Sequence, residues 1–317
     1  MKSALICGVN GQDGAFLSRY LLNKGYRVFG TSRDAQGRSS NNLIRLGIKD
    51  DVHLVTMAPE DFLSVFQAIK FSAPEEIYFL SGQSSVGLSF EQPTETIKSL
   101  TLGSLNVLEA CRLLDKSIRQ YHAGSSECFG DTNGLPATET TPFKPRSPYA
   151  VGKSSSFWLV DNYREAYGLY ASTGILFNHE SPLRPNRFVT QKIIQTAKRI
   201  ANGSKETLDL GRLDIVRDWG WAPDYVEAMW MILQQPFAED FVIATGRSFT
   251  LEDFVETTFQ SLGLEWMQHT RQKTDLMRPT DITSSFSNPS KARERLGWSA
   301  RLDMHGVIQK MINDDLN

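Results

Sequence analysis

The stretch that decides the fold is Ser3-Ala4-Leu5-Ile6-Cys7-Gly8-Val9-Asn10-Gly11-Gln12-Asp13-Gly14, near the amino end of this 317-residue chain. Its apolar half predicts a buried strand, and the glycines that follow lead into a helical pattern that continues to about Lys24. Without Cβ atoms, such glycines let backbone N–H groups and the positive end of a helix approach a pyrophosphate. They would also suit a tight turn with nothing bound, but the position after a first strand and before a second favours dinucleotide binding. The predicted cofactor-binding residues here are Gly8, Asn10, Gly11, Gln12, Asp13 and Gly14.

Apolar segments separated by helical patterns recur along the chain. They lie near residues 2–7, 26–31, 52–56, 76–80, 119–123, 171–176 and 241–244. This alternation is typical of a parallel sheet with helices on both faces. We therefore predict an α/β fold, a Rossmann-type doubly wound parallel sheet with a smaller mixed α/β lobe. Because the last strand returns to the first sheet, the lobes should interleave: 1–177 with about 218–246 for the dinucleotide-binding domain, and 178–217 with 247–317 for the smaller, substrate-binding lobe.

The end of the second expected strand, residues 26–31, bears on the choice of cofactor. An acidic residue there would grip the ribose 2′-hydroxyl of NAD, but Ser32 and Arg33 stand there instead. A guanidinium suits a 2′-phosphate, so the sequence predicts NADP, with Arg38 as a second contact. The alternative is that Arg33, next to Asp34, is only a solvated loop charge.

Composition limits the classes of partner. The chain is 40% hydrophobic and 22% charged, as is ordinary for a soluble globular enzyme, and its net charge is −2. This charge gives no electrostatic reason to expect nucleic acid or an anionic membrane as a partner. The three cysteines, Cys7, Cys111 and Cys128, lack metal-ligand spacing, and the chain enters a strand at once without a signal peptide. We expect a cytoplasmic protein with reduced thiols and no metal.

Two further stretches carry the chemistry, Ser125-Ser126-Glu127 and Tyr149-Ala150-Val151-Gly152-Lys153. Tyr149 and Lys153 lie one helical turn apart and so share a face. An ammonium near a phenol favours the phenolate, which predicts a Tyr149 pKa below about 10 and a base that works near neutral pH. Glu127 is the second candidate base, at the same strand end. The alternative for Glu127 is a carboxylate that only binds substrate or accepts a backbone hydrogen bond.

Taken together, the motifs resemble a known family. Besides those already quoted, they are the segments 145–150, 175–182, 217–220, 240–246 and 278–279. The chain resembles the extended short-chain dehydrogenase/reductases over nearly its whole length, and within them most closely the GDP-mannose 4,6-dehydratase family. That resemblance implies an NADP-dependent lyase acting on a nucleotide sugar, as a homodimer or homotetramer.

The resemblance also implies a redox-neutral elimination with five catalytic residues, two of which, Tyr149 and Lys153, also bind the cofactor. Tyr149, assisted by Lys153 and Ser125, takes the proton of the C4 hydroxyl as hydride passes to NADP. Glu127 then removes the C5 proton, the C6 hydroxyl leaves as water with a proton from Glu127 or Ser126, and hydride returns to C6. The product would be GDP-4-keto-6-deoxy-mannose. Physical chemistry agrees, because elimination needs a base besides the tyrosine already committed to O4.

For the substrate, the resemblance implies a set of binding residues. Arg217 and Arg278 would contact the phosphates, Asn178 would lie near the diphosphate, and Arg184 and Lys192 would lie around the nucleotide. Arginine forks suit bidentate phosphate contacts, although each charge by itself could be a surface group. The full set is Ser84, Ser85, Asn178, Glu180, Arg184, Val189, Lys192, Arg217, Arg278 and Asp281.

The chain also departs from the family pattern. Ser125 stands where the family usually has Thr, and Ala58 and Phe79 replace an Asp and an Asn of the cofactor-binding segments. Arg212 replaces an Asn and Asp281 a Glu near the nucleotide. Three alternatives stay open at this point: a reductase of a GDP-4-keto-6-deoxy sugar, a dehydratase of another GDP-sugar such as a GDP-heptose, and a non-catalytic NADP-binding module.

Overall fold

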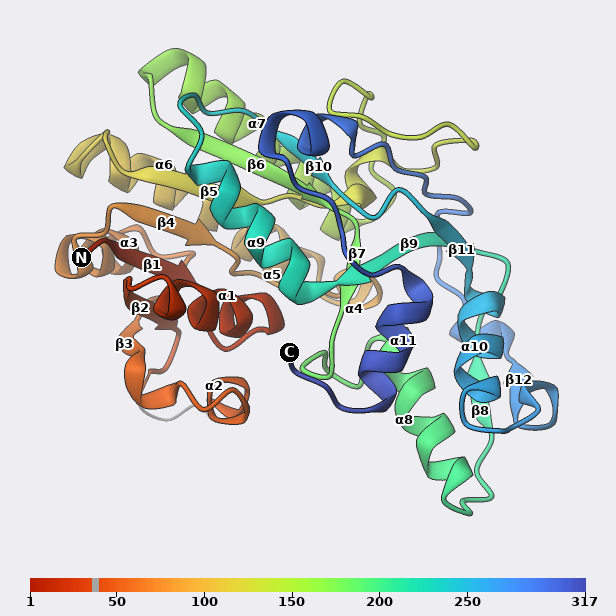
Figure 1. Cartoon of the computed structure of the whole chain (residues 1–317). Helices are drawn as coiled ribbons and strands as arrows, with labels where there is room; N and C mark the ends of the chain where they lie inside the picture. The colour runs from red at the N-terminus through yellow and green to blue at the C-terminus, as the bar shows by residue number, and fades with distance from the viewer. Residues whose placement is uncertain (36–39) are drawn as a thin grey trace.

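A seven-stranded parallel sheet forms the centre of the protein (Figure 1). The computed structural model describes residues 1–35 and 40–317. The strands run in the order β10-β6-β5-β4-β1-β2-β3, and all neighbouring pairs are parallel. Their bounds are β1 Ser3–Cys7, β2 Arg27–Ser32, β3 His53–Thr56, β4 Glu76–Phe79, β5 Arg119–Ala123, β6 Ala171–Leu176 and β10 Phe241–Ile243. This confirms the predicted Rossmann-type sheet and the return of the segment 241–244 to it.

Helices cover both faces of the sheet, as Figure 1 shows. On one face, α1 (Gln12–Asn23) and α9 (Ala222–Leu233) pack against each other over the apolar side chains of the sheet. On the other face lie α3 (Phe62–Ser72), α6 (Gly103–Leu114) and α7 (Pro148–Tyr167). The shorter helix α2 (Asn41–Arg45) lies between β2 and β3, and the shorter helices α4 (Val86–Glu91) and α5 (Pro93–Ile97) lie between β4 and α6. From β1 the chain adds β2 and β3 on one side of the sheet and then β4, β5, β6 and β10 on the other, so the strand order switches sides between β1 and β4. Ligands of open α/β sheets bind at the carboxyl ends of the strands near such a switch point.

The remaining elements build two small sheets and a second apolar core. The three-stranded sheet has the order β11-β9-β7, with β7 Asn178–Glu180, β9 Val216–Trp221 and β11 Ser248–Thr250. The two-stranded sheet pairs β8 (Leu208–Leu210) with β12 (Thr270–Gln272). Helices α8 (Val189–Ala201), α10 (Leu251–Gln260) and α11 (Met304–Ile312) surround a core that contains Trp219 and Trp221. The predicted boundaries between the two lobes stay a prediction.

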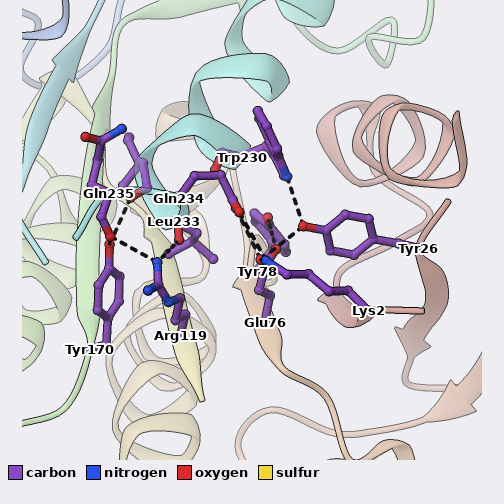
Figure 2. Close-up of polar contacts among 11 residues, drawn as sticks. Lys2, Tyr26, Glu76, Tyr78, Arg119, Tyr170, Trp230, Leu233, Gln234 and Gln235 are labelled. Carbon is purple, nitrogen blue, oxygen red and sulfur yellow. Dashed lines mark hydrogen bonds and ion pairs between the residues drawn. The ribbon is translucent and has the colours of Figure 1, made fainter. Parts of the chain in front are cut away.

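A polar network connects the amino ends of the strands of the large sheet to the carboxyl end of α9 (Figure 2). The buried Glu76 carboxylate accepts hydrogen bonds from Tyr78 Oη at 2.7 Å, Tyr26 Oη at 3.1 Å and Gln234 Nε2 at 3.2 Å, and pairs with Lys2 Nζ at 3.2 Å. Glu76 and Tyr78 belong to β4, Lys2 and Tyr26 immediately precede β1 and β2, and Gln234 immediately follows α9. Because β1, β2 and β4 are parallel, the network lies at the amino ends of these strands, and the glycine loop lies at their carboxyl ends.

Within the part of the chain that the structure describes, no helix combines the length and the apolar character that crossing a bilayer would require.

Candidate active site

The glycine loop joins β1 to α1 in the way that the sequence predicts. Gly8 has a φ of +90°, a conformation that L side chains rarely adopt. A Cβ on Gly14 would collide with the Gly8 carbonyl oxygen, so the loop and the first turn of α1 pack too closely for any other residue. The loop therefore presents backbone N–H groups and the positive end of a helix, and these residues fit a dinucleotide pyrophosphate.

A groove of about 600 Å³ runs along this loop and the ends of β2 and β4. It contains every predicted cofactor residue of the glycine loop, together with Ser32 and Arg33. Arg38 lies outside the described residues. The lining residues that sequence reasoning missed include Met57, Pro59, Leu80, Ser81, Gly82, Gln83, Gln92, Glu95, Ser99, Arg187 and Phe188, whereas Ser84 and Arg184, predicted for the substrate, also line it.

At the end of β2, the guanidinium of Arg33 is held by two carboxylates. Arg33 Nη2 lies 2.7 Å from Glu95 Oε1, and Nε lies 3.5 Å from Glu60 Oε1. All three side chains are partly exposed, so the pairing is weak and open to competition. Arg33 is therefore placed at the groove but already has partners from two distant segments.

The predicted catalytic residues at the end of β5 lie together. Pro148 begins α7, and the Ser147 side chain caps that helix by accepting a hydrogen bond from Ala150 N at 3.1 Å. Lys153 Nζ donates to the Ala123 carbonyl at 2.6 Å and lies 5.9 Å from the centroid of the Tyr149 ring.

Ser125 lies between the strand end and the tyrosine. Its hydroxyl accepts a hydrogen bond from Glu127 N at 3.3 Å at the start of the short 3₁₀ turn Ser126–Phe129, and it hydrogen-bonds the Tyr149 side chain. The structure thus brings the five predicted residues to one strand end, with Ser126 buried in that turn.

The expected lowering of the Tyr149 pKa is wrong for the protein alone. Burial raises the pKa of Tyr149 well above its usual value, and the hydrogen bond to Ser125 lowers it only in part. The ammonium that was expected to act on the phenol is directed at the Ala123 carbonyl, and burial lowers the pKa of Lys153 itself to about 8. Helical spacing correctly predicts the shared face of the two residues, but the surrounding desolvation sets the sign of the shift.

Glu127 faces a cluster of charges from distant parts of the chain. Burial raises the pKa of its carboxyl group, while Arg217 and Arg278 oppose that effect and Asp281 adds to it. Asp281 Oδ1 bridges the two guanidiniums, at 3.2 Å from Arg217 Nη2 and 3.4 Å from Arg278 Nη1. Among the described residues no side chain donates a hydrogen bond to the Glu127 carboxylate, so its oxygens are available to a ligand.

The other predicted substrate residues are spread over β7 and α8. Asn178 begins β7 opposite Trp219 of β9. Glu180 is buried, where it accepts from Thr190 Oγ1 at 2.7 Å and lies 3.2 Å from Arg184 Nε. Glu180 is therefore occupied in positioning Arg184. Val189 is the first residue of α8, and on the same helix Lys192 Nζ donates to the Asp209 carbonyl at 2.5 Å.

Ser84 and Ser85 precede α4. Ser84 lines the groove, and the Ser85 side chain caps α4 by accepting from Leu88 N at 3.3 Å.

A buried ion pair joins the glycine loop to β7, and sequence reasoning did not assign it. His179 Nε2 lies 2.9 Å from Asp13 Oδ2, its Nδ1 lies 2.8 Å from the Phe177 carbonyl oxygen, and its ring stacks on Tyr225. Burial alone would raise the pKa of Asp13, but His179 and Gln12 lower it to about 2. Because 166 positions separate Asp13 from His179, local spacing does not indicate that they pair. The signal in the sequence is that each residue belongs to one of the quoted motifs.

Solved structures of nucleotide-sugar enzymes share this fold. A dTDP-glucose 4,6-dehydratase from Bacillus anthracis in complex with NAD superposes with a TM-score of 0.87 at 18% identity, covering 99% of this chain and 96% of that one. A UDP-glucose 4-epimerase from Thermus thermophilus in complex with NAD gives a TM-score of 0.85 at 24% identity and covers 98% of both chains. At these identities the likeness shows the Rossmann-type fold.

Sequence relatives define the family. The family model described as GDP-mannose 4,6 dehydratase matches residues 5–311. GDP-mannose 4,6 dehydratase 1 of Arabidopsis thaliana is 44% identical over 329 residues, covering 99% of this chain and 90% of the plant protein. The GDP-mannose 4,6-dehydratase of Yersinia enterocolitica is 40% identical over 356 residues, covering 100% of this chain and 94% of the bacterial one. The chain belongs to the GDP-mannose 4,6-dehydratase family.

Proposed function

We propose that this protein is a hydro-lyase that converts GDP-mannose to GDP-4-keto-6-deoxy-mannose with a nicotinamide cofactor. Full-length membership of the family supports the reaction class. The observation that carries the proposal is the Glu127 carboxylate, which lies at the same strand end as Ser125 and has no hydrogen-bond donor to its oxygens within the described residues. A simple reductase has no use for such a base, whereas elimination at C5 and C6 requires one.

The first proton transfer is assigned to Tyr149. When bound, the cofactor supplies an acceptor for hydride from C4 and a donor of hydride to C6. Tyr149 takes the proton of the C4 hydroxyl, and its hydrogen bond from Ser125 stabilises the phenolate that results. Lys153, one turn further along α7, adds positive charge on the same side.

Elimination is assigned to Glu127. A ketone at C4 acidifies the C5 proton, which Glu127 removes, and the C6 hydroxyl leaves as water with a proton from Glu127 or the neighbouring Ser126. The raised pKa of Glu127 suits its roles as base and as acid. A stronger base removes the C5 proton more readily, and the protonated carboxyl group can then donate that proton to the leaving C6 hydroxyl.

The substrate diphosphate is assigned to Arg217 and Arg278. Both guanidiniums are already held close together by Asp281, which reduces the entropy lost when they form bidentate phosphate contacts. Asn178, Arg184 and Lys192 are proposed for the rest of the nucleotide. Ser84, Ser85, Glu180, Val189 and Asp281 complete the proposed binding set, with Glu180 acting through Arg184.

We propose NADP as the cofactor, bound at its 2′-phosphate by Ser32 and Arg33, with Arg38 as a further contact. Arg33 lies at the groove, and its partly exposed pairs with Glu60 and Glu95 are weak enough for a phosphate to displace. In cofactor titrations the wild type should bind NADP more tightly than NAD, and Arg33→Ala should narrow that gap by about tenfold. Arg293→Ala, at an exposed arginine of the segment Ala292–Leu296, is the matched control. Equal affinity of the wild type for both dinucleotides would contradict the assignment.

The family resemblance further supports action in the cytoplasm as a homodimer or homotetramer. Light scattering of the purified protein would determine the number of subunits.

The function is tested by incubating purified protein with GDP-mannose and no added reductant. We expect a product that has lost one water, at a rate that NADPH does not raise. Loss of water only from a GDP-heptose would reassign the sugar. A protein that leaves GDP-mannose intact but reduces a GDP-4-keto-6-deoxy sugar with NADPH would be a reductase instead.

A further inference from the structure

The segment that follows β7 is fastened to the glycine loop. Besides the pair between His179 and Asp13, Gln12 Nε2 donates to the His179 carbonyl at 3.1 Å. Ser181 Oγ in turn donates to Gln12 Oε1 at 2.8 Å, and Arg45 Nη1 donates to the Pro182 carbonyl at 2.9 Å. The chain around 179–182 therefore has a defined position at the amino end of α1, where the glycine loop presents its N–H groups.

The next residues continue along the groove. Pro185, Arg187 and Phe188 line the same groove as the glycine loop, and α8 begins immediately afterwards at Val189. The Phe188 ring contacts two guanidiniums, with Arg184 at 3.9 Å and Arg187 at 5.1 Å from its centroid. Phe188 thus keeps both cations at the border of the groove.

Among the described residues, three arginines line the groove, and they differ in their partners. Arg33 pairs with Glu60 and Glu95, and Arg184 pairs with the buried Glu180. Within the described ranges 1–35 and 40–317, Arg187 forms no ion pair with a carboxylate. A phosphate that binds Arg187 therefore meets no competing carboxylate among the described residues, whereas at Arg33 or Arg184 it must compete with one.

We propose that Arg187 binds the pyrophosphate of the dinucleotide cofactor and acts together with the glycine loop. The loop contributes backbone N–H donors and the helix dipole, and Arg187 contributes an exposed guanidinium with bidentate geometry from a different segment. Asp13, whose carboxylate also borders the groove, does not repel the phosphates strongly because His179 pairs with it. The inference rests on the proposed nicotinamide cofactor but not on the identity of the sugar.

The assignment to the pyrophosphate has a distinctive consequence. NAD, NADP and ADP-ribose all carry a pyrophosphate, and only NADP carries a 2′-phosphate. Loss of Arg187 should therefore weaken all three ligands to the same degree, in contrast to loss of Arg33, which should weaken NADP selectively.

The experiment is a calorimetric titration of wild type, Arg187→Ala, Arg187→Lys and the control Arg293→Ala with NAD, NADP and ADP-ribose. Arg187→Ala should raise each Kd by about tenfold, the effect of losing one charge-assisted hydrogen bond, with an unchanged melting temperature. Arg187→Lys should recover part of the affinity, and Arg293→Ala should bind as the wild type does.

Three results would overturn the inference while leaving the proposed function intact: affinities that Arg187→Ala does not change, a loss confined to NADP, or an equal loss in Arg293→Ala. Failure of the wild type to bind any of the three ligands would instead refute the proposed cofactor, and the role of Arg187 with it.

Discussion

Glu127 shows how opposing charges set the state of a single carboxyl group. Burial raises its pKa, Arg217 and Arg278 lower it, and the Asp281 carboxylate between them weakens their effect. The result is a carboxyl group whose pKa lies above that of an exposed glutamate, so its ionised form is the stronger base.

Glu127→Gln should separate oxidation at C4 from loss of water. The amide occupies the same space but cannot accept the C5 proton, so the reduced nicotinamide should accumulate, or C4 oxidation should reverse, without a 6-deoxy product. Near-ultraviolet absorbance of the bound cofactor and the mass of the product report the two steps. An undiminished yield of 4-keto-6-deoxy sugar would show that another group is the base.

In the wild type, the same carboxyl group predicts the acid limb of the pH profile. The base must be deprotonated, so kcat/KM should fall as the pH drops through a pKa that lies above the usual value for glutamate.

Tyr149→Phe should remove the first base and leave the fold unchanged, because only a hydroxyl is deleted. Loss of a general base costs on the order of 10²–10⁴ in rate. The measurement is the rate of dehydration under saturating cofactor, with circular dichroism to establish that the variant is folded. Near-normal turnover by a folded Tyr149→Phe protein would rule out the assigned role.

At the scale of elements, the contact between α1 and β7 depends on one buried pair. Asp13 lies in the first turn of α1 and His179 in the middle of β7. Pairing lowers the pKa of Asp13 to about 2 and raises that of His179, against the effect of burial on each. The stability that Asp13 contributes is present above its pKa in the unfolded chain and is lost as the pH falls through about 2. The stability that His179 contributes is present below its pKa in the unfolded chain and is lost as the pH rises through its raised pKa in the folded protein.

Asp13→Asn should therefore reduce the free energy of unfolding by about 2 kcal/mol, most strongly between about pH 4 and 6.5. The difference from wild type should shrink on either side of that window. Denaturant unfolding at a series of pH values measures it. Asp314→Asn, which breaks an exposed pair with Arg45, is the control and should show little effect at any pH. A loss in Asp13→Asn that does not vary with pH would mean that packing, not charge, holds the two elements together.

At the scale of the whole molecule, function and stability are separated between the carboxyl ends and the amino ends of the strands of the large sheet. The carboxyl ends of the strands carry the glycine loop, the groove and the catalytic residues, while the amino ends carry the network around Glu76 (Figure 2). That network joins β1, β2 and β4 to α9, elements from both halves of the sequence.

Glu76→Leu should lower stability without changing catalysis. The substitution leaves the hydroxyls of Tyr26 and Tyr78 without their carboxylate acceptor, a cost of about 3 kcal/mol. Chemical denaturation and steady-state kinetics measure the two properties, and Glu75→Leu, at the exposed neighbour, is the control. A changed KM or kcat in the folded Glu76→Leu protein would show that the two ends of the strands are coupled.

Local spacing was sufficient for much of this architecture. Alternating apolar runs predict all seven strands of the large sheet, because strand and helix formation depend on periodicities within about ten residues. Gly8, with its φ of +90°, and Gly14, where a Cβ would collide, are residues whose backbone geometry only glycine permits, so they are visible in the sequence itself. The spacing of Tyr149 and Lys153 likewise predicts their common helix face.

The sequence by itself determined the seven strands of the large sheet, the glycine loop and the family, whereas the tertiary structure alone decided which charges meet. The pairs between Asp13 and His179 and between Arg33 and Glu95 join residues that are 166 and 62 positions apart. The raised pKa of Tyr149 and the place of Arg187 in the groove are also outcomes of the folded state. The physical reason is that pairing and desolvation depend on strand order and burial, which bring distant segments together and are not encoded in the spacing of neighbouring residues.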